Sequence, residues 1–591
     1  MYKNGFIKLA LVAPKLRVGD VKYNLENIIS EIKKCDKAEI VLLPEMCITS
    51  NNCKDLFFQN YLYEENLKAI EQIRDLGLKQ IIVINSFIRI DNNLVKASFV
   101  LKDGNILGIV PSSYSDEYFG GVLTEQDEVE VLGELVPFGQ IVFASSDEKV
   151  SFVVSDSFGL NDLSIDSDAS LVLCSNYLAS FAKGNEYLKT ITKAKSMLSK
   201  SAYIVCSSSS SETSSEELPI SLMLAYANDE VLLEDEELTL DSKIRFVDVD
   251  VEKIDYQKRC ACIDNVREFV TYFDLEESSD FDFENPIDTT PFLHLEDKDY
   301  KQIITTQALS LLKRLDYIGI KKTVLGVSGG LDSTLALLCL AYAYDLEGMD
   351  RKNILGFTLP TKNTSSQTKD SAWKLMEGLG ITAREINIGE DVNRQMELIG
   401  HSVQDVTYEN IQARFRTYTL MNMANKEGAI VVGTSDMSEV ALGWSTFNGD
   451  QMAMYGVNAG LPKTLIREVV RYYKKVYPNL SEVLDQVVNT PISPELSKNQ
   501  KTEDIIGKYE INDYILYNIL NNGYNYEKLE FMIQKAFGIS SEGAKKYVAN
   551  FNRRFHHQQF KRLTMPEGVK LLKFSLSPRS GTFVIGDVYE K

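Results

Sequence analysis

Runs of aliphatic and β-branched residues recur along the first half of the chain and predict a β-rich unit. The expected strands are residues 7–14, 40–45, 80–90, 149–157 and 169–176, followed by strands near 203–209, 222–234 and 244–250. Stretches with helical periodicity lie between some of them. The pattern therefore favours a mixed α/β unit.

An acidic stretch, residues 274–286, interrupts this pattern. It holds six carboxylates, no basic residue and few apolar side chains, which is typical of a linker. We expect an N-terminal domain over residues 1–272, a linker over 273–290 and a C-terminal domain over 291–591.

Strand and helix patterns alternate regularly beyond the linker. Strands are expected at residues 323–327, 353–360, 383–388 and 429–434, with helices at 332–345, from the second strand to about 379, and at 408–428. This order predicts a parallel sheet covered by helices on both faces. Ligands of such sheets bind at the carboxyl ends of the strands.

Length and charge narrow the class of protein. A chain of 591 residues exceeds what one hydrophobic core usually organises, so two large domains are expected. The net charge of −21 argues against a general nucleic-acid binder, and no apolar run is long enough for a membrane helix. Eight scattered cysteines without paired spacing suggest reduced thiols in a cytoplasmic protein rather than zinc sites or a disulfide framework.

The strongest local motif lies between the first C-terminal strand and the helix that follows it. It comprises Gly326, Val327, Ser328, Gly329, Gly330, Leu331, Asp332, Ser333 and Thr334. Adjacent glycines let the backbone approach an anion, hydroxyls add donors, and the helix N-terminus favours negative charge. The string therefore predicts a phosphate-binding loop, although it lacks the lysine of a Walker site.

Asp332 does not suit an anion site unless a cation lies between carboxylate and phosphate. Mg2+ bridging the two is the natural expectation. Glu439 follows the end of a neighbouring strand by about one helical turn, so it is expected to join Asp332 on the metal. Alternatively, Glu439 is a solvated carboxylate that stabilises a helix start.

The loop SGGxDS resembles that of enzymes that split ATP between its α and β phosphates. The segments 406–417, 431–450, 454–465, 490–496, 500–517, 551–562 and 575–581 resemble, in order, those of the two-domain, glutamine-dependent NAD+ synthetases. The resemblance spans roughly residues 290–585. It implies a doubly wound parallel sheet of the ATP-pyrophosphatase (adenine nucleotide alpha-hydrolase-like) type.

The resemblance also implies a reaction. ATP adenylates the carboxylate of deamido-NAD+ (nicotinic acid adenine dinucleotide), ammonia displaces AMP, and pyrophosphate leaves; no enzyme nucleophile is needed. ATP would contact Gly326, Val327, Ser328, Gly329, Gly330, Leu331, Asp332, Ser333 and Thr434. Deamido-NAD+ would contact Asn410, Arg414, Glu439, Trp444, Ser445, Thr446, Phe447 and Lys561. Arg414 is alternatively a surface cation, and the basic run around Lys561 a solvated helix face.

The stretches 43–46, 106–111 and 175–181 of the N-terminal half resemble segments of the nitrilase-like glutaminase domain of the same enzymes, which implies an α-β-β-α sandwich. That domain uses a Glu, Lys and Cys triad; Glu45 matches the glutamate, whereas Ser112 and Ser155 stand where the lysine and cysteine should be. Cys47 and Cys174 do not match the nucleophile's place and are expected to be small buried side chains.

Losing two of three catalytic residues should abolish thioester chemistry. We therefore expect an inactive amidase domain beside a synthetase that takes free ammonia, in a homo-oligomer built on synthetase dimers. The alternative is a glutamine-hydrolysing synthetase whose N-terminal domain uses an unrecognised nucleophile.

Overall fold

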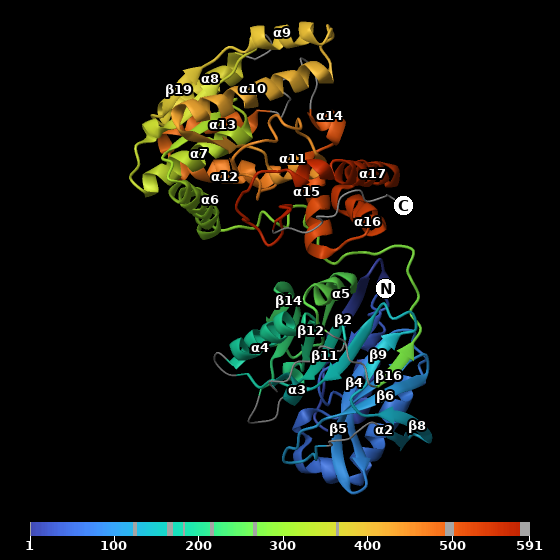
Figure 1. Ribbon diagram of the computed structural model, residues 1–591. Helices are drawn as coiled ribbons and strands as arrows, with labels where there is room; N and C mark the ends of the chain where they lie inside the picture. Colours follow the sequence, from blue (N-terminus) through green and yellow to red (C-terminus); the bar gives the residue numbers. More distant parts are fainter. Residues whose placement is uncertain are drawn as a thin grey trace. The chain divides into compact units, whose positions relative to one another are not determined.

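The computed structural model describes residues 2–121, 127–161, 169–180, 184–212, 218–263, 269–361, 366–490 and 502–579. The chain divides into two compact units, Met1–Pro286 and Ile287–Lys591 (Figure 1). Most of the segment 490–496 and part of the segment 575–581, both of which carry the family resemblance, lie outside the described residues. No helix in the described part of the chain combines the length and apolar character needed to cross a membrane.

The N-terminal unit is built on two sheets. The first runs β1-β2-β3-β4-β5-β6-β8-β7 with β15 beside β2, and the second runs β14-β13-β12-β11-β10-β9-β16. The strands of the first are β1 (Tyr2–Lys3), β2 (Phe6–Ala13), β3 (Ile40–Leu42), β4 (Ile81–Ile90), β5 (Asn93–Lys102), β6 (Asn105–Pro111), β7 (Asp127–Val131), β8 (Glu134–Phe138) and β15 (Lys243–Asp250). Those of the second are β9 (Val142–Ser145), β10 (Ser151–Ser155), β11 (Leu171–Asn176), β12 (Ala202–Ser207), β13 (Ser221–Ala227), β14 (Glu230–Glu237) and β16 (Val270–Phe273).

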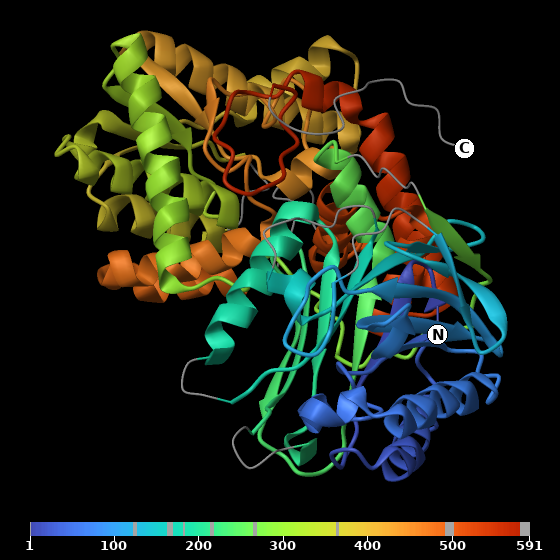
Figure 2. The ribbon, with the colours of Figure 1, turned by 90° about the horizontal axis from the view of Figure 1, so that it is seen from below.

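The two sheets bury a shared core, and helices cover their outer faces. Leu9 and Val83 of the first sheet pack in one cluster with Phe152 and Leu173 of the second. Helices α1 (Val21–Ile32) and α2 (Asn60–Arg74) cover the first sheet, and α4 (Gly184–Ser199) covers the second (Figure 2). The short helices α3 (Ser157–Asn161) and α5 (Val251–Cys260) complete the unit. The expected α-β-β-α sandwich is confirmed.

The acidic stretch expected to be a linker packs along the N-terminal unit. The ring of Phe281 is fully buried, and Phe281 and Phe283 both contact the ring of Phe6. The buried ammonium of Lys8 bonds Glu284 at 2.6 Å. Two aromatic side chains thus anchor a segment whose charge alone suggested a solvated linker.

The C-terminal unit has a five-stranded parallel sheet in the order β19-β18-β17-β20-β21. Its strands are β17 (Lys322–Gly326), β18 (Ile354–Thr358), β19 (Thr382–Glu385), β20 (Ala429–Gly433) and β21 (Tyr455–Gly456). The helices are α6 (Asp297–Ile318), α7 (Leu331–Leu346), α8 (Ser366–Gly378), α9 (Gly389–Leu398), α10 (Val406–Glu427), α11 (Met437–Leu442), α12 (Lys463–Val476), α13 (Ser481–Asn489), α14 (Thr502–Ile506), α15 (Tyr509–Tyr517), α16 (Tyr526–Phe537), α17 (Ser541–His557) and α18 (Gln559–Leu563). Alternate strand residues face α6, α7 and α12 on one side and α9 and α10 on the other, which confirms the doubly wound sheet.

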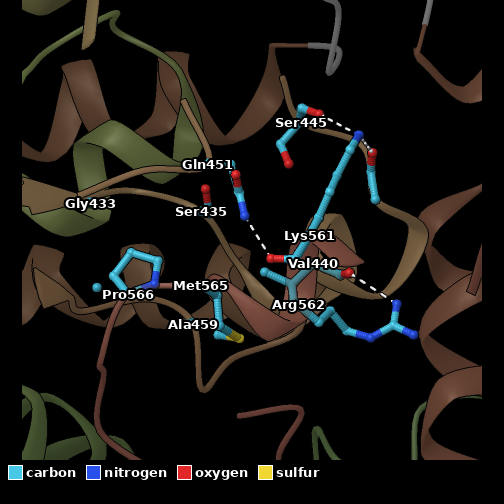
Figure 3. A pocket seen from close by; sticks show the side chains of 12 residues that line it. Gly433, Ser435, Val440, Ser445, Gln451, Ala459, Lys561, Arg562, Met565 and Pro566 are labelled. Atoms are coloured by element: carbon cyan, nitrogen blue, oxygen red, sulfur yellow. Dashed lines mark hydrogen bonds between the residues drawn. The ribbon is translucent and has the colours of Figure 1, made fainter. Parts of the chain in front are cut away.

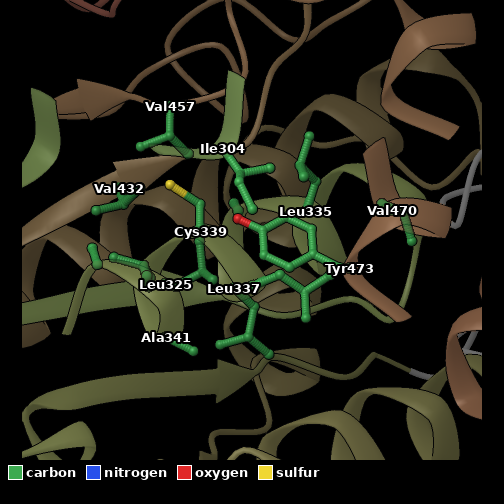
Figure 4. Packing of buried hydrophobic residues seen from close by; sticks show 14 of the residues in the cluster. Ile304, Leu325, Leu335, Leu337, Cys339, Ala341, Val432, Val457, Val470 and Tyr473 are labelled. Carbon is green, nitrogen blue, oxygen red and sulfur yellow. The ribbon is translucent and has the colours of Figure 1, made fainter. Parts of the chain in front are cut away.

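Helix α7 is buried on nearly every side, and this fixes the loop that precedes it. Leu335, Leu337 and Cys339 are fully buried, and they pack with Tyr473 of α12 and Ile304 of α6 (Figure 4). A helix with apolar residues all round is stable only inside a core. Its N-terminus is therefore held rigidly at the carboxyl end of β17.

We expect Leu335→Ala to destabilise the protein by about 2–5 kcal/mol, because truncation leaves a cavity in this packed cluster. Leu398→Ala is the matched control: Leu398 is 78% exposed on α9, so the change should be within about 0.5 kcal/mol. Urea unfolding of the full chain measures both. Equal effects would contradict the packing described here.

Candidate active site

The glycine-rich loop between β17 and α7 is folded as an anion cradle. Gly329 has a φ of +86°, a conformation that favours glycine. The Ser328 hydroxyl accepts from the Gly330 N–H at 3.2 Å and lies 3.1 Å from the Ser333 hydroxyl. Gly330 is the N-cap residue of α7, and no side chain caps this helix start. The first N–H groups of α7 therefore face the loop without a side-chain acceptor.

Three carboxylates meet beside this loop, and we call Asp332, Asp436 and Glu439 the acidic cluster. Their ligand oxygens all lie within 4.8 Å of one another. Asp332 lies in the first turn of α7, and Asp436 caps α11 by accepting from the Glu439 N–H at 2.8 Å. The sequence predicted that Asp332 and Glu439 act together, and the structure brings them together. Asp436 was missed, because an acidic cap residue three positions before a glutamate has a sufficient structural explanation.

A buried lysine joins the acidic cluster. Lys463, at the start of α12, is 1% exposed, and its ammonium lies 2.6 Å from Asp332, 2.6 Å from Asp436 and 2.9 Å from Glu439. Burial lowers the pKa of Lys463, but the three carboxylates outweigh burial and raise it well above the ordinary value. Lys463 therefore remains an ammonium. Sequence reasoning missed it, although it lies in the segment 454–465 that carries the family resemblance.

The acidic cluster fits a hard divalent cation. Three carboxylates face one ammonium, and Asp332 Oδ1 is buried without a hydrogen-bond partner among the described residues. Burial, with the nearby charge of Asp332, raises the pKa of Glu439 to about 7 against the lowering effect of Lys463. Carboxylate oxygens are the ligands that Mg2+ prefers, and a cation here would favour the ionised forms.

A cavity of about 920 Å³ is lined by the loop, by Asp332 and Glu439 of the acidic cluster and by most of the remaining predicted residues. It lies at the carboxyl ends of the parallel strands, where such sheets bind ligands. Among the predicted residues it is lined by Gly326, Val327, Ser328, Gly329, Gly330, Leu331, Asp332, Ser333, Thr434, Asn410, Glu439, Trp444, Ser445, Thr446 and Lys561.

Arg414 and Phe447 are not among the residues that line this cavity. The Arg414 Nε donates to the Phe447 carbonyl at 3.2 Å, and the Thr446 hydroxyl donates to Asn410 at 2.7 Å. Both helix residues thus hold the 444–447 segment in place. Arg416, two residues along α10 and so on another face, lines the cavity instead.

A side cavity of about 20 Å³ shares residues with the main one and has room for one water-sized molecule (Figure 3). The Lys561 ammonium donates to the carbonyls of Gly443 and Ser445 at 2.8 and 2.7 Å. Burial lowers the pKa of Lys561. Arg554 also lines the main cavity, and its guanidinium lies 5.2 Å from the Trp444 ring centroid, so one face of the predicted stacking aromatic contacts a cation.

Glu45 in the N-terminal unit has partners that the sequence did not predict. Its Oε1 accepts from the Lys96 ammonium at 2.8 Å, and its Oε2 accepts from the Ser157 hydroxyl. The serines at the triad positions make no described hydrogen bond to Glu45. Ser112 lies opposite Lys96 on the neighbouring strand, its N–H bonded to the Lys96 carbonyl at 2.9 Å. The Ser155 hydroxyl lies against Gly159.

Comparison with known proteins finds similarity in both units of the chain. The NAD synthase family model matches residues 303–564. The glutamine-dependent NAD(+) synthetase of Mycobacterium tuberculosis is 29% identical, covering 98% of this chain and 95% of its own. The enzyme of the same name from Aquifex aeolicus is 26% identical over 96% of each. A solved glutamine-dependent NAD(+) synthetase from Cytophaga hutchinsonii covers 98% of both chains at 17% identity and a TM-score of 0.42. The chain is thus similar over nearly its whole length to glutamine-dependent NAD(+) synthetases, and its C-terminal unit matches the NAD synthase family.

Proposed function

We propose that the C-terminal unit adenylates deamido-NAD+ with ATP and converts the adenylate to NAD+ with ammonia, releasing AMP and pyrophosphate. The observation that carries the proposal is one cavity lined by the glycine-rich loop, by Asp332 and Glu439 of the acidic cluster and by the 444–446 segment. A carboxylate is a poor electrophile, so its activation needs a leaving group and stabilised charge on the departing pyrophosphate.

Different residues of the cavity would have different roles in this reaction. The loop N–H groups and Ser328 would hold phosphate oxygens, and Thr434 would contact the adenosine part of ATP. Asn410, Trp444 and the neighbouring residues would hold deamido-NAD+. Asp332, Asp436 and Glu439 would hold Mg2+, which supplies Lewis-acid neutralisation of phosphate charge when bound. Lys463 keeps the three acids together and presents one fixed positive charge beside the loop.

Two nitrogen donors are compatible with this reaction, free ammonia and ammonia released from glutamine. The relatives that match nearly the whole chain are named glutamine-dependent, which favours glutamine. The contacts of Glu45 with Lys96 and Ser157 support the same choice, because they provide a buried carboxylate with a cation and a hydroxyl. That the N-terminal unit is inert stays a prediction that these observations do not favour.

The test supplies purified protein with deamido-NAD+, ATP and MgCl2, and with ammonium or glutamine as nitrogen source. We expect ammonium to give NAD+, AMP and pyrophosphate in equal amounts, and glutamine to give the same products with glutamate. Absence of AMP with either donor would contradict the synthetase assignment. Turnover with ammonium alone would restore the interpretation of an inert N-terminal unit.

A further inference from the structure

Glu45 lies at the centre of a buried site in which two carboxylates share one ammonium. Glu45 is 2% exposed and Lys96 7% exposed, and the Lys96 ammonium also bonds Asp116 at 3.0 Å. Burial lowers the pKa of Lys96, but Glu45 and Asp116 raise it above the ordinary value. The lysine is therefore a fixed cation rather than a base. Of the two carboxylates on Lys96, Glu45 is the one that contacts the Ser157 hydroxyl and can accept its proton.

Lys96 reaches Glu45 from a different strand than the sequence led us to expect. The β5–β6 register pairs Ala97 with Pro111, and the Ser112 N–H bonds the Lys96 carbonyl. Lys96 and Ser112 are thus neighbours across two antiparallel strands. Cross-strand neighbours lie about 5 Å apart, so a lysine on either strand can serve the same carboxylate. The positive charge that was expected at position 112 is therefore supplied by Lys96.

Ser157 supplies a hydroxyl at the same carboxylate. It starts α3 directly after β10, is partly exposed, and donates its hydroxyl proton to Glu45 Oε2. The Tyr177 N–H donates to Ser157 Oγ at 3.2 Å, which would stabilise negative charge on that oxygen. Base, hydroxyl and fixed cation are therefore adjacent, which is the general arrangement of an activated nucleophile.

We propose that Ser157, Glu45 and Lys96 form an amide-hydrolysing site for a primary carboxamide, with Ser157 as the nucleophile. The inference rests on the proposed function only in taking glutamine as that carboxamide. The acyl intermediate would be a serine ester instead of the cysteine thioester expected for such a domain.

The reaction balances with water as the only co-substrate. Ser157 Oγ bonds the carboxamide carbon while its proton passes to Glu45. Glu45 returns this proton to the leaving nitrogen, the C–N bond breaks, and ammonia leaves an acyl ester on Ser157. Water then attacks the ester carbon and gives a proton to Glu45, which passes it to Ser157 Oγ as the carboxylic acid departs; the acid then ionises and its proton converts the ammonia released to ammonium. Lys96 remains protonated and balances the charge of Glu45 throughout.

The other nucleophilic side chains nearby are less well placed. Cys174 is fully buried, donates to the Asp156 carbonyl at 3.3 Å, and burial raises its thiol pKa well above the ordinary value. Ser155 Oγ lies so close to the Gly159 backbone that a Cβ there would come within 2.4 Å of it. Ser157 is the serine that contacts Glu45.

The test measures glutamate released from glutamine by the full chain, with hydroxylamine added to trap an acyl ester as glutamyl hydroxamate. We expect Ser157→Ala to lose about a thousand-fold in glutamate release and all hydroxamate. Ser157→Cys should retain hydrolysis, and its new thiol should be alkylated by a glutamine-analogue electrophile, with the modified peptide located by mass spectrometry. Ser146→Ala, a surface serine of the same unit, is the matched control.

Ammonium-driven NAD+ formation, measured on every variant, separates this inference from the proposed function. If ammonium supports turnover but Ser157→Ala leaves glutamine hydrolysis unchanged, the inference is overturned. Loss in Ser155→Ala with retention in Ser157→Ala would assign the nucleophile to Ser155 and overturn it equally. If the wild-type chain releases no glutamate while using ammonium, the inference fails and the synthetase proposal stands.

Discussion

Asp332→Asn is expected to lower the rate of AMP and pyrophosphate formation by about a thousand-fold. The asparagine keeps the size of the side chain in the first turn of α7 but removes one of three carboxylates from the acidic cluster. Pyrophosphate departure would then lack part of its charge stabilisation. Steady-state assays of AMP formation with ammonium as donor, over a range of MgCl2 concentrations, measure the effect. The half-saturating MgCl2 concentration should rise as well.

Asp391→Asn is the matched control for this prediction. Asp391 is exposed in the first turn of α9 and does not line the cavity, so its replacement should leave the rate within about two-fold of that of the unsubstituted protein. A thermal unfolding curve of each variant confirms that the fold is kept. An unchanged rate in Asp332→Asn would show that phosphate chemistry does not take place at this loop.

Lys463→Met is expected to lower the free energy of unfolding by about 3–5 kcal/mol, because it removes the cation from three buried carboxylates. Methionine fills much of the same volume, so the lost charge dominates over lost packing. Urea unfolding of the full chain, with a chelator present, measures the cost. Added MgCl2 should recover part of it, since a cation that binds only the folded state stabilises that state.

The loss in free energy of unfolding caused by Lys463→Met should depend on pH in a defined direction. Glu439 has a folded-state pKa of about 7, above its ordinary value, so its contribution to stability is lost as the pH rises through 7. Lys463→Met removes a lowering influence on that pKa, so the destabilisation should be larger at pH 8 than at pH 5.

Lys474→Met, on the same helix, is the control for a lysine in a partly exposed pair. It should cost no more than about 1 kcal/mol. Equal losses in the two variants, or a loss in Lys463→Met that neither MgCl2 nor low pH reduces, would contradict the electrostatic account.

Local patterns were sufficient to predict the C-terminal sheet and most of its site. Hydrophobic runs followed by helical periodicity identify β17, α7 and β20, and parallel strands bring their carboxyl ends to one edge. This is why Asp332 and Glu439, far apart in the sequence, were expected to meet. Helix α9 was not expected, because residues 389–398 are mostly polar; its helical signal is limited to Val392 and Met396, which are four residues apart and share one buried face.

Contacts made across strands were not accessible from the sequence. Whether Lys96 lies opposite Ser112 depends on the β5–β6 register, and a shift of one residue would turn every side chain to the other face. The choice of Ser157 over Ser155 depends on where β10 ends and α3 begins, and strand ends are poorly specified by composition. Lys463 was hidden for another reason, since nothing local distinguishes a buried lysine from a solvated one at a helix start.

In this chain Lys96 supplies the cation that was expected at position 112. Substitutions at positions 96 and 112 should therefore affect one another. Ser112→Lys alone would add a second ammonium beside the first, and the repulsion would oppose the triad it was meant to restore. Lys96→Asn alone would leave Glu45 buried without its counter-charge. Only the double replacement keeps a single ammonium beside Glu45, so the two substitutions should be strongly non-additive, each deleterious in the background where the other is absent.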